Sequence, residues 1–168
     1  MRNKIIIIIV ILVLSAALTI GGYIAWTTRN TAKSEAVSVL STFAEATNSV
    51  WYCENGYGIG INNSTPWWEQ IFLSNLPLGD TVNKVETYLE DRDYNISKTF
   101  IENSEDSYNK GKTYWELQGD NGNYSVDARL SANELTLNNC FEDFSSMDSS
   151  LDPENYSSVI VIKFRDNL

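Results

Sequence analysis

The sequence predicts an α+β protein in which an N-terminal transmembrane helix continues into an amphipathic helix, followed by short helices packed on an antiparallel β-meander. Three observations predict this fold. A long uncharged apolar segment opens the chain, apolar residues then recur at helical spacing, and from Tyr94 onward their spacing changes to two. Helices followed by a run of strands are typical of α+β folds. We therefore divide the chain into a cytoplasmic tip and anchor, residues 1–26, and an exported domain, residues 27–168.

The first expected element is the membrane anchor. Residues from Ile5 to Trp26 carry no charge, and as a helix they would span about 33 Å, enough for the hydrocarbon core of a bilayer. Arg2 and Lys4 precede this segment, which favours a cytoplasmic N-terminus. We expect a single-pass protein of the cell membrane with its domain on the extracytoplasmic side. The alternative is a signal peptide cleaved near residues 15–17, and it also exports the domain.

A long helix is expected over residues 27–51. Its apolar residues recur three or four apart, which is the period of one helical face. They are Ala36, Val39, Leu40, Phe43, Ala46 and Val50. The membrane helix is therefore expected to continue into an amphipathic helix that packs on the domain core.

Two short helices are expected next, over residues 66–75 and 80–91. Thr65 and Pro66 form a helix start, with Pro at the first helical position. Asp80 or Thr81 is the expected cap of the second helix. Its apolar face consists of Val82, Val85, Tyr88 and Leu89.

Strands are expected across residues 94–164. The clearest is a hairpin of residues 113–118 and 123–130, whose Asn121-Gly122 pair predicts a type I′ turn. The other predicted strands are residues 94–101, 134–141 and 158–164. The last of these is too apolar to be an edge strand with both faces in water.

A glycine-rich segment with many aromatic residues lies between the predicted helices. Gly56, Gly58 and Gly60 do not match the dinucleotide-binding fingerprint. The candidate binding residues are Trp51, Tyr52, Tyr57, Trp67 and Trp68. An aromatic core that supports a small fold is the favoured interpretation of these residues, and a sugar- or peptide-binding platform is the functional alternative.

Composition narrows the functional classes. The formal net charge is −10, and all 22 acidic residues follow the apolar segment, so nucleic acid and an anionic membrane surface are disfavoured as partners. The chain has no histidine, which excludes Ser-His-Asp and Cys-His catalysis and histidine-ligated metals. Carboxylate chemistry, oxygen-ligated calcium or magnesium, and binding without catalysis remain. We expect no catalytic residue, metal or cofactor.

Cys53 and Cys140 are the only two cysteines. In an oxidising compartment they are expected to form a disulfide; the alternative is two buried, unpaired thiols.

The stretch from Leu76 to Leu89 carries a Pro-x-Gly start at Pro77 and the spacing V-x-x-x-L that ends at Leu89. It resembles a helix of small exported modules similar to the outer-membrane assembly lipoprotein SmpA and to the beta-lactamase-inhibitor-protein fold. The resemblance implies a helix before a curved antiparallel sheet, and a binding or assembly module without catalytic residues. This chain departs from the lipoprotein pattern, because it has a transmembrane-type anchor and no lipobox cysteine.

These observations predict a membrane-anchored extracytoplasmic protein that binds or organises a protein or cell-surface partner without catalysis. A pilin-like filament or secretion-system subunit is one alternative, because an apolar helix precedes an amphipathic helix and a sheet, although no Gly-Phe processing site is present. A carboxylate-based hydrolase of cell-surface carbohydrate is the other.

Overall fold

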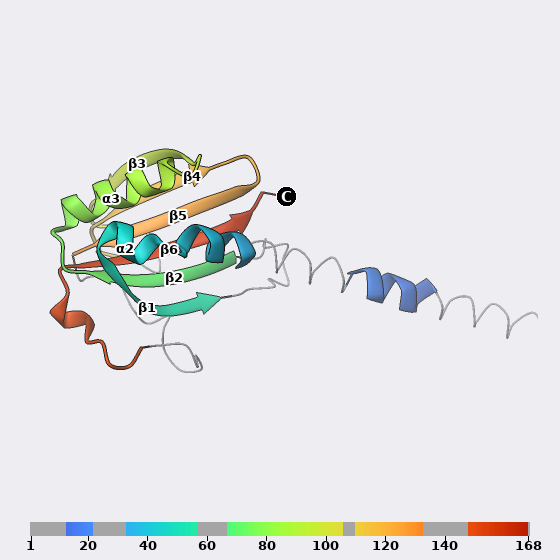
Figure 1. The fold of residues 1–168 in the computed structure, drawn as a ribbon. Helices are drawn as coiled ribbons and strands as arrows, with labels where there is room; N and C mark the ends of the chain where they lie inside the picture. The colour runs from blue at the N-terminus through green and yellow to red at the C-terminus, as the bar shows by residue number, and fades with distance from the viewer. Residues whose placement is uncertain (1–12, 22–32, 57–66, 106–109, 133–147, 168) are drawn as a thin grey trace, which may run out of the picture.

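The computed structural model describes residues 13–21, 33–56, 67–105, 110–132 and 148–167, and Figure 1 shows their arrangement. The described strands form one six-stranded antiparallel sheet in the order β1-β2-β6-β5-β4-β3. They are β1 (Ser49–Gly56), β2 (Trp67–Ser74), β3 (Asn95–Ile101), β4 (Tyr114–Asp120), β5 (Tyr124–Ser131) and β6 (Ser158–Asp166). The described helical segments are residues 13–21, residues 33–40, α2 (Phe43–Thr47), α3 (Leu78–Glu90) and the 3-10 helix η2 (Pro153–Asn155). The chain therefore has the α+β fold class that the sequence predicts.

The sheet is not a simple meander. β3 to β6 follow one another in chain order, whereas β1 and β2 form a separate hairpin that joins the sheet where β2 pairs with β6. β6 therefore lies inside the sheet, between β2 and β5, which agrees with the apolar character of residues 158–164. The strand predicted over residues 134–141 lies outside the described residues.

The N-terminal segment is described only in part. Residues 13–21 are helical, and the remainder of the predicted anchor from Ile5 to Trp26 lies outside the described residues. None of the helices that the structure describes is both long and apolar enough to cross a membrane.

The prediction of one helix over residues 27–51 is wrong at its C-terminal end. The helix of residues 33–40 is followed by a turn and by α2, which ends at Thr47. Asn48 then adopts a left-handed conformation with a φ of 54°, and its N–H caps the carbonyls of Ala44 and Glu45. A left-handed residue ends a helix because the next residues leave the helical path. Trp51 and its neighbours therefore belong to β1.

The prediction of a short helix over residues 66–75 is also wrong, because residues 67–74 form β2. β2 pairs with β1 on one side and β6 on the other, so it is a central strand. Most of its residues are buried, on both faces of the sheet. A short apolar run of this kind fits a buried strand as well as a helix, and here long-range pairing decides.

α3 lies close to the helix predicted over residues 80–91, but its cap differs. The N-cap is Pro77, without a side-chain hydrogen bond, rather than Asp80 or Thr81. The Thr81 hydroxyl instead donates to the carbonyls of Leu76 at 3.3 Å and Pro77 at 3.2 Å. Thr81 is buried, so these bonds satisfy a side chain that has lost contact with water.

The hairpin of β4 and β5 matches the predicted pair of strands, whereas its turn is not type I′. Gly122 has a φ of 90°, but neither Asn121 nor Asn123 has a positive φ. The Asn121 side-chain oxygen accepts from the backbone N–H groups of Asn123 at 3.1 Å and Tyr124 at 2.8 Å. This Asx-type geometry replaces the second left-handed residue that a type I′ turn requires.

The main core lies between the helices and one face of the sheet, the face that the helices cross in Figure 1. Phe43 of α2 packs on Phe72 of β2, with ring centroids 4.7 Å apart, and on Tyr88 of α3 at 5.1 Å. The Tyr88 hydroxyl donates to the Val39 carbonyl, which ties α3 to the helix of residues 33–40. The opposite face, called here the open face, is crossed by no described α-helix.

Candidate functional site

The open face changes from apolar to polar along the strands. At one end a smaller cluster contains Tyr52, Cys53, Ile71, Leu73, Tyr114 and Val159. The segment before β6 covers this end, since Leu151 and Tyr156 pack on the cluster and the Asp148 N–H donates to the Tyr52 carbonyl at 2.9 Å. The polar end is therefore the candidate site.

Strand register arranges the polar end in two rows that run across the sheet. Successive residues of a strand point to opposite faces, and Ile162 and Phe164 belong to the helix side, so Lys163 and Arg165 lie on the open face. The first row is Glu69, Lys163, Asp127, Gln118 and Ser97. The second row is Trp67, Arg165, Ser125, Asp120 and Asn95.

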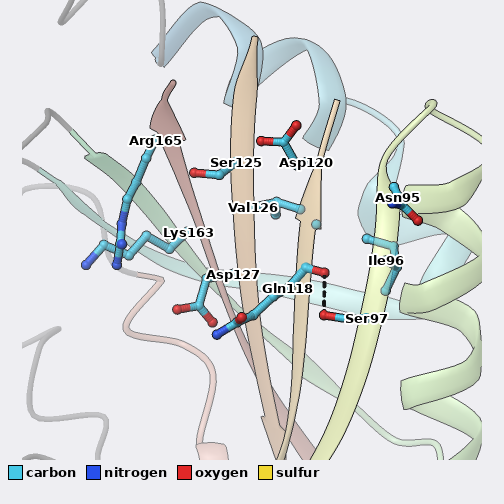
Figure 2. A pocket seen from close by; sticks show the side chains of 11 residues that line it. Asn95, Ile96, Ser97, Gln118, Asp120, Ser125, Val126, Asp127, Lys163 and Arg165 are labelled. Carbon is cyan, nitrogen blue, oxygen red and sulfur yellow. Dashed lines mark hydrogen bonds between the residues drawn. The ribbon is translucent and has the colours of Figure 1, made fainter. Parts of the chain in front are cut away.

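Most of these side chains line a cleft of about 460 Å³, called here the open-face cleft. Figure 2 shows Asp127, Ser125 and Gln118 on neighbouring strands, with Lys163 and Arg165 on β6 at one side. The volume lies within the usual range for small-molecule sites, roughly 300–1,000 Å³. The cleft is thus large enough for a small ligand or for one group of a larger partner.

Lys163 supplies a half-buried positive charge to the cleft. Its Nζ lies 3.9 Å from the centroid of the Trp67 ring. Burial lowers the pKa of the Lys163 ammonium, the Glu69 carboxylate acts in the opposite direction, and the nearby charge of Arg165 lowers it further. Among the described residues, no carboxylate comes within ion-pair distance of Lys163. Its charge is therefore only partly compensated.

Asp127 supplies a buried acceptor. Its Oδ2 lies 3.5 Å from Nη2 of Arg129, whose Nε donates to the Glu116 carboxylate at 3.2 Å. The other oxygen, Oδ1, is buried and has no hydrogen-bond partner among the described residues. A buried carboxylate oxygen without a donor is unfavourable, so the position is suited to a donor from a ligand or water.

Asp120 closes one end of the cleft, and both of its carboxylate oxygens already accept hydrogen bonds. Its Oδ1 accepts from the Gly122 N–H at 2.7 Å, and its Oδ2 accepts from the Asn167 side chain. Its role is to hold the hairpin turn and the chain after β6 together. Asp127 is consequently the carboxylate of the cleft with an unused oxygen.

The aromatic residues singled out from the sequence do not share one surface. Trp51 and Trp68 belong to the helix side, where Trp68 is buried with Lys33 over its ring at 4.3 Å. Tyr52 is buried in the apolar cluster of the open face. Trp67 is half-buried at the rim of the polar end, and Tyr57 lies outside the described residues. Of the aromatic residues that the sequence offered as candidate binding residues, Trp67 is thus the described one that lies at the candidate site.

Cys53 is fully buried in β1 and is disulfide-bonded. Cys140, the other cysteine of the sequence, lies outside the described residues. The pairing of Cys53 with Cys140 stays a prediction. The bonded Cys53 lies in the apolar cluster, away from the polar rows.

Sequence reasoning missed Asp127, Lys163 and Arg165 as site residues. The alternation of Ser125, Asp127 and Arg129 with apolar residues marks one face of β5, so the signal for a polar face was present. The pairing of β6 with both β2 and β5 is what brings the polar face of each strand together. In the described parts of the chain, no group of three or more histidine, cysteine or acidic residues is arranged to hold a metal ion.

No family model, curated protein or solved structure matches this chain. The resemblance of residues 76–89 to SmpA-like modules stays a prediction. The functional proposal therefore rests on the geometry of the open-face cleft.

Proposed function

We propose that this protein is a membrane-anchored extracytoplasmic binding module that holds its partner in the open-face cleft and does not turn it over. The uncharged segment from Ile5 to Trp26, preceded by Arg2 and Lys4, supports a transmembrane helix with the domain outside. In this proposal the transmembrane helix leads into the amphipathic helices of residues 33–47, whose buried residues pack on the sheet.

One observation carries the binding role. Lys163 and Asp127 line the same cleft. Among the described residues, the half-buried Lys163 has no ion-pair partner and the buried Asp127 Oδ1 has no hydrogen-bond donor. Desolvated polar groups of this kind cost free energy in the isolated protein. A partner that supplies the missing contacts recovers that free energy, so the arrangement is typical of a recognition site.

Binding without turnover is supported by the chemistry of the cleft. The chain has no histidine, and the Asp127 carboxylate is held by Arg129 while that of Asp120 is held by Gly122 and Asn167. Carboxylates fixed in this way favour orienting a ligand over transferring protons.

Site-specific photo-crosslinking in cells that express the full chain tests this function. A photoreactive residue at Ser125, inside the cleft, is expected to give an adduct that disappears when Lys163→Gln is added. The matched control is the same residue at Asn83, which is exposed on α3, outside the cleft. Equal adducts at both positions, or no adduct at Ser125, would contradict the proposal.

A pilin-like filament or secretion-system subunit is a second candidate. It is favoured by the apolar stripe Ala36, Leu40 and Phe43, which is buried against the sheet directly after the apolar N-terminal segment. Val37 on the same helix is 51% exposed and is free to contact a neighbour. A photoreactive residue in place of Val37 would then link each subunit to the next and give a ladder of oligomers, whereas a binding module would give no ladder.

A further inference from the structure

The two cations of the cleft lie side by side. Lys163 and Arg165 are two residues apart on β6 and so project from the same face, and in Figure 2 their side chains extend to the same side of the strand. The structure records no ion pair for either residue among its described parts. Two neighbouring positive charges, one of them half-buried, form a site for an anionic group.

The rest of the cleft offers hydrogen bonds beside apolar contacts from Ile96 and Val126. Asp127 Oδ1 is a free buried acceptor, and Ser125, Gln118 and Asn95 add a hydroxyl and two amides. The apolar cluster of the open face lies at its other end, under Leu151 and Tyr156. The cleft is therefore suited to a ligand that combines hydroxyl groups with an apolar ring face.

The net charge limits how many anionic groups the ligand carries. The chain has a formal charge of −10, so a polyanion such as nucleic acid is repelled at long range. A ligand with one negative charge meets little of this repulsion and gains two charge-assisted contacts. A volume of about 460 Å³ suits one or two sugar rings.

We propose that the open-face cleft binds an acidic sugar, a polyhydroxylated ring that carries one carboxylate. The carboxylate accepts hydrogen bonds from Lys163 and Arg165, and a ring hydroxyl donates to Asp127 Oδ1. This assignment rests on the proposed binding function and adds the chemical class of the partner to it.

Titration calorimetry of the full chain in detergent tests the assignment, with glucuronate as the ligand and glucose as its neutral counterpart. Glucuronate is expected to bind at least tenfold more tightly than glucose. Lys163→Gln is expected to weaken glucuronate binding at least tenfold, and Arg165→Gln severalfold. Lys110→Gln removes the same charge from an exposed loop outside the cleft and should leave binding unchanged.

Arg165 is exposed, so Arg165→Gln should not disturb the fold. It provides a test of the site even if the fold does not tolerate replacement of the half-buried Lys163. Asp127→Asn should weaken glucose more than glucuronate, because it weakens the hydroxyl contact common to both and removes a negative charge that repels the glucuronate carboxylate. Equal affinity for the two sugars, no measurable binding of glucuronate, or binding unaffected by both cation variants would overturn the assignment. A Lys163-dependent crosslink at Ser125 without glucuronate binding would overturn the sugar class alone and leave the binding function standing.

Discussion

At the scale of single residues, the chain buries several polar groups and gives most of them a partner. Tyr94 is 2% exposed, and its hydroxyl donates to Glu35 at 3.0 Å. Glu35 also accepts from the Asn121 side chain at 3.5 Å, so one carboxylate joins the helix of residues 33–40 to Tyr94, just before β3, and to the turn of the hairpin. A buried tyrosine next to a carboxylate keeps its proton, because burial and the negative charge both disfavour the tyrosinate.

Tyr94 is therefore expected to make stability depend on alkaline pH. Burial, followed by the charge and the hydrogen bond of Glu35, raises the pKa of the Tyr94 phenol above its ordinary value of 10.0. Because the pKa is raised in the folded state, the contribution of Tyr94 to folding stability is complete below pH 10. It is lost as pH rises above 10, because the tyrosine of the unfolded chain ionises first. Between pH 9 and pH 11, the free energy of unfolding of the wild type should therefore fall by about 1.4 kcal/mol more than that of Tyr94→Phe.

Urea unfolding of the wild type and Tyr94→Phe at pH 9, 10 and 11 measures this difference. Other tyrosines ionise in both proteins, so their effect cancels in the comparison. Parallel loss of stability in the two proteins would show that the folded state does not favour neutral Tyr94.

At the scale of elements, the end of α2 is set by one residue. Asn48 has a φ of 54°, a conformation that asparagine and glycine adopt more readily than other residues. The Ser74 hydroxyl donates to the Asn48 carbonyl at 3.1 Å, so the cap also positions the end of β2 beside the start of β1. The helix-to-strand change therefore depends on a single left-handed position.

Asn48→Ala should destabilise the domain by about 1 kcal/mol, because alanine pays a steric cost in the left-handed region. Asn48→Gly should stay within about 0.5 kcal/mol of the wild type, because glycine has no such cost. Chemical denaturation measures both values. Asn83→Ala, in the exposed interior of α3, is the control and should be neutral or slightly stabilising. A glycine variant as unstable as the alanine variant would mean that the Asn48 side chain, and not its backbone conformation, matters.

Gly119 shows how an element is fitted to its neighbours. It lies within β4, and a Cβ atom there would come 2.4 Å from Cδ1 of Ile96 and 2.9 Å from Cγ1 of Val126. Both residues flank Gly119 on adjacent strands, so the missing side chain lets them close the core above β4. Glycine in a strand interior often marks such a close approach.

At the scale of the whole molecule, the predicted disulfide would join β1 to a distant part of the chain. Closing a loop of about 88 residues stabilises a fold by roughly 4–5 kcal/mol in the loop-entropy model, which is an upper estimate. Cys140→Ser should therefore lower the thermal midpoint of unfolding measured without reductant. The same variant should make no difference to the midpoint in the presence of reductant.

Thiol labelling of denatured, unreduced protein taken from its native compartment checks the pairing directly. No thiol should react in the wild type, and one should react in Cys140→Ser. Labelling of two thiols in the wild type would contradict the pairing.

Local signals in the sequence were enough to locate α3, the strands of the β4–β5 hairpin and the apolar β6. Each depends on neighbours within a few residues: a 3.6-residue period in α3, alternation in β5, and a run of apolar residues in β6. The same signals failed at β2. Thr65 and Pro66 resemble a helix start, and residues 67–74 are apolar enough to form either a buried helix or a buried strand. They failed again at the helix end, where one left-handed asparagine stops a helical pattern that otherwise continues.

The sequence by itself determined the fold class, the separation of an apolar N-terminal segment from an acidic domain, and the exclusion of histidine chemistry, because these depend on composition and short-range period. The tertiary structure alone decided the candidate site. Asp127 and Lys163 are 36 positions apart in the numbering and become neighbours only because β5 pairs with β6, and Glu69 joins them through β2. Strand order is fixed by pairing between distant segments and by burial of the shared core, and neither leaves a local mark in the sequence.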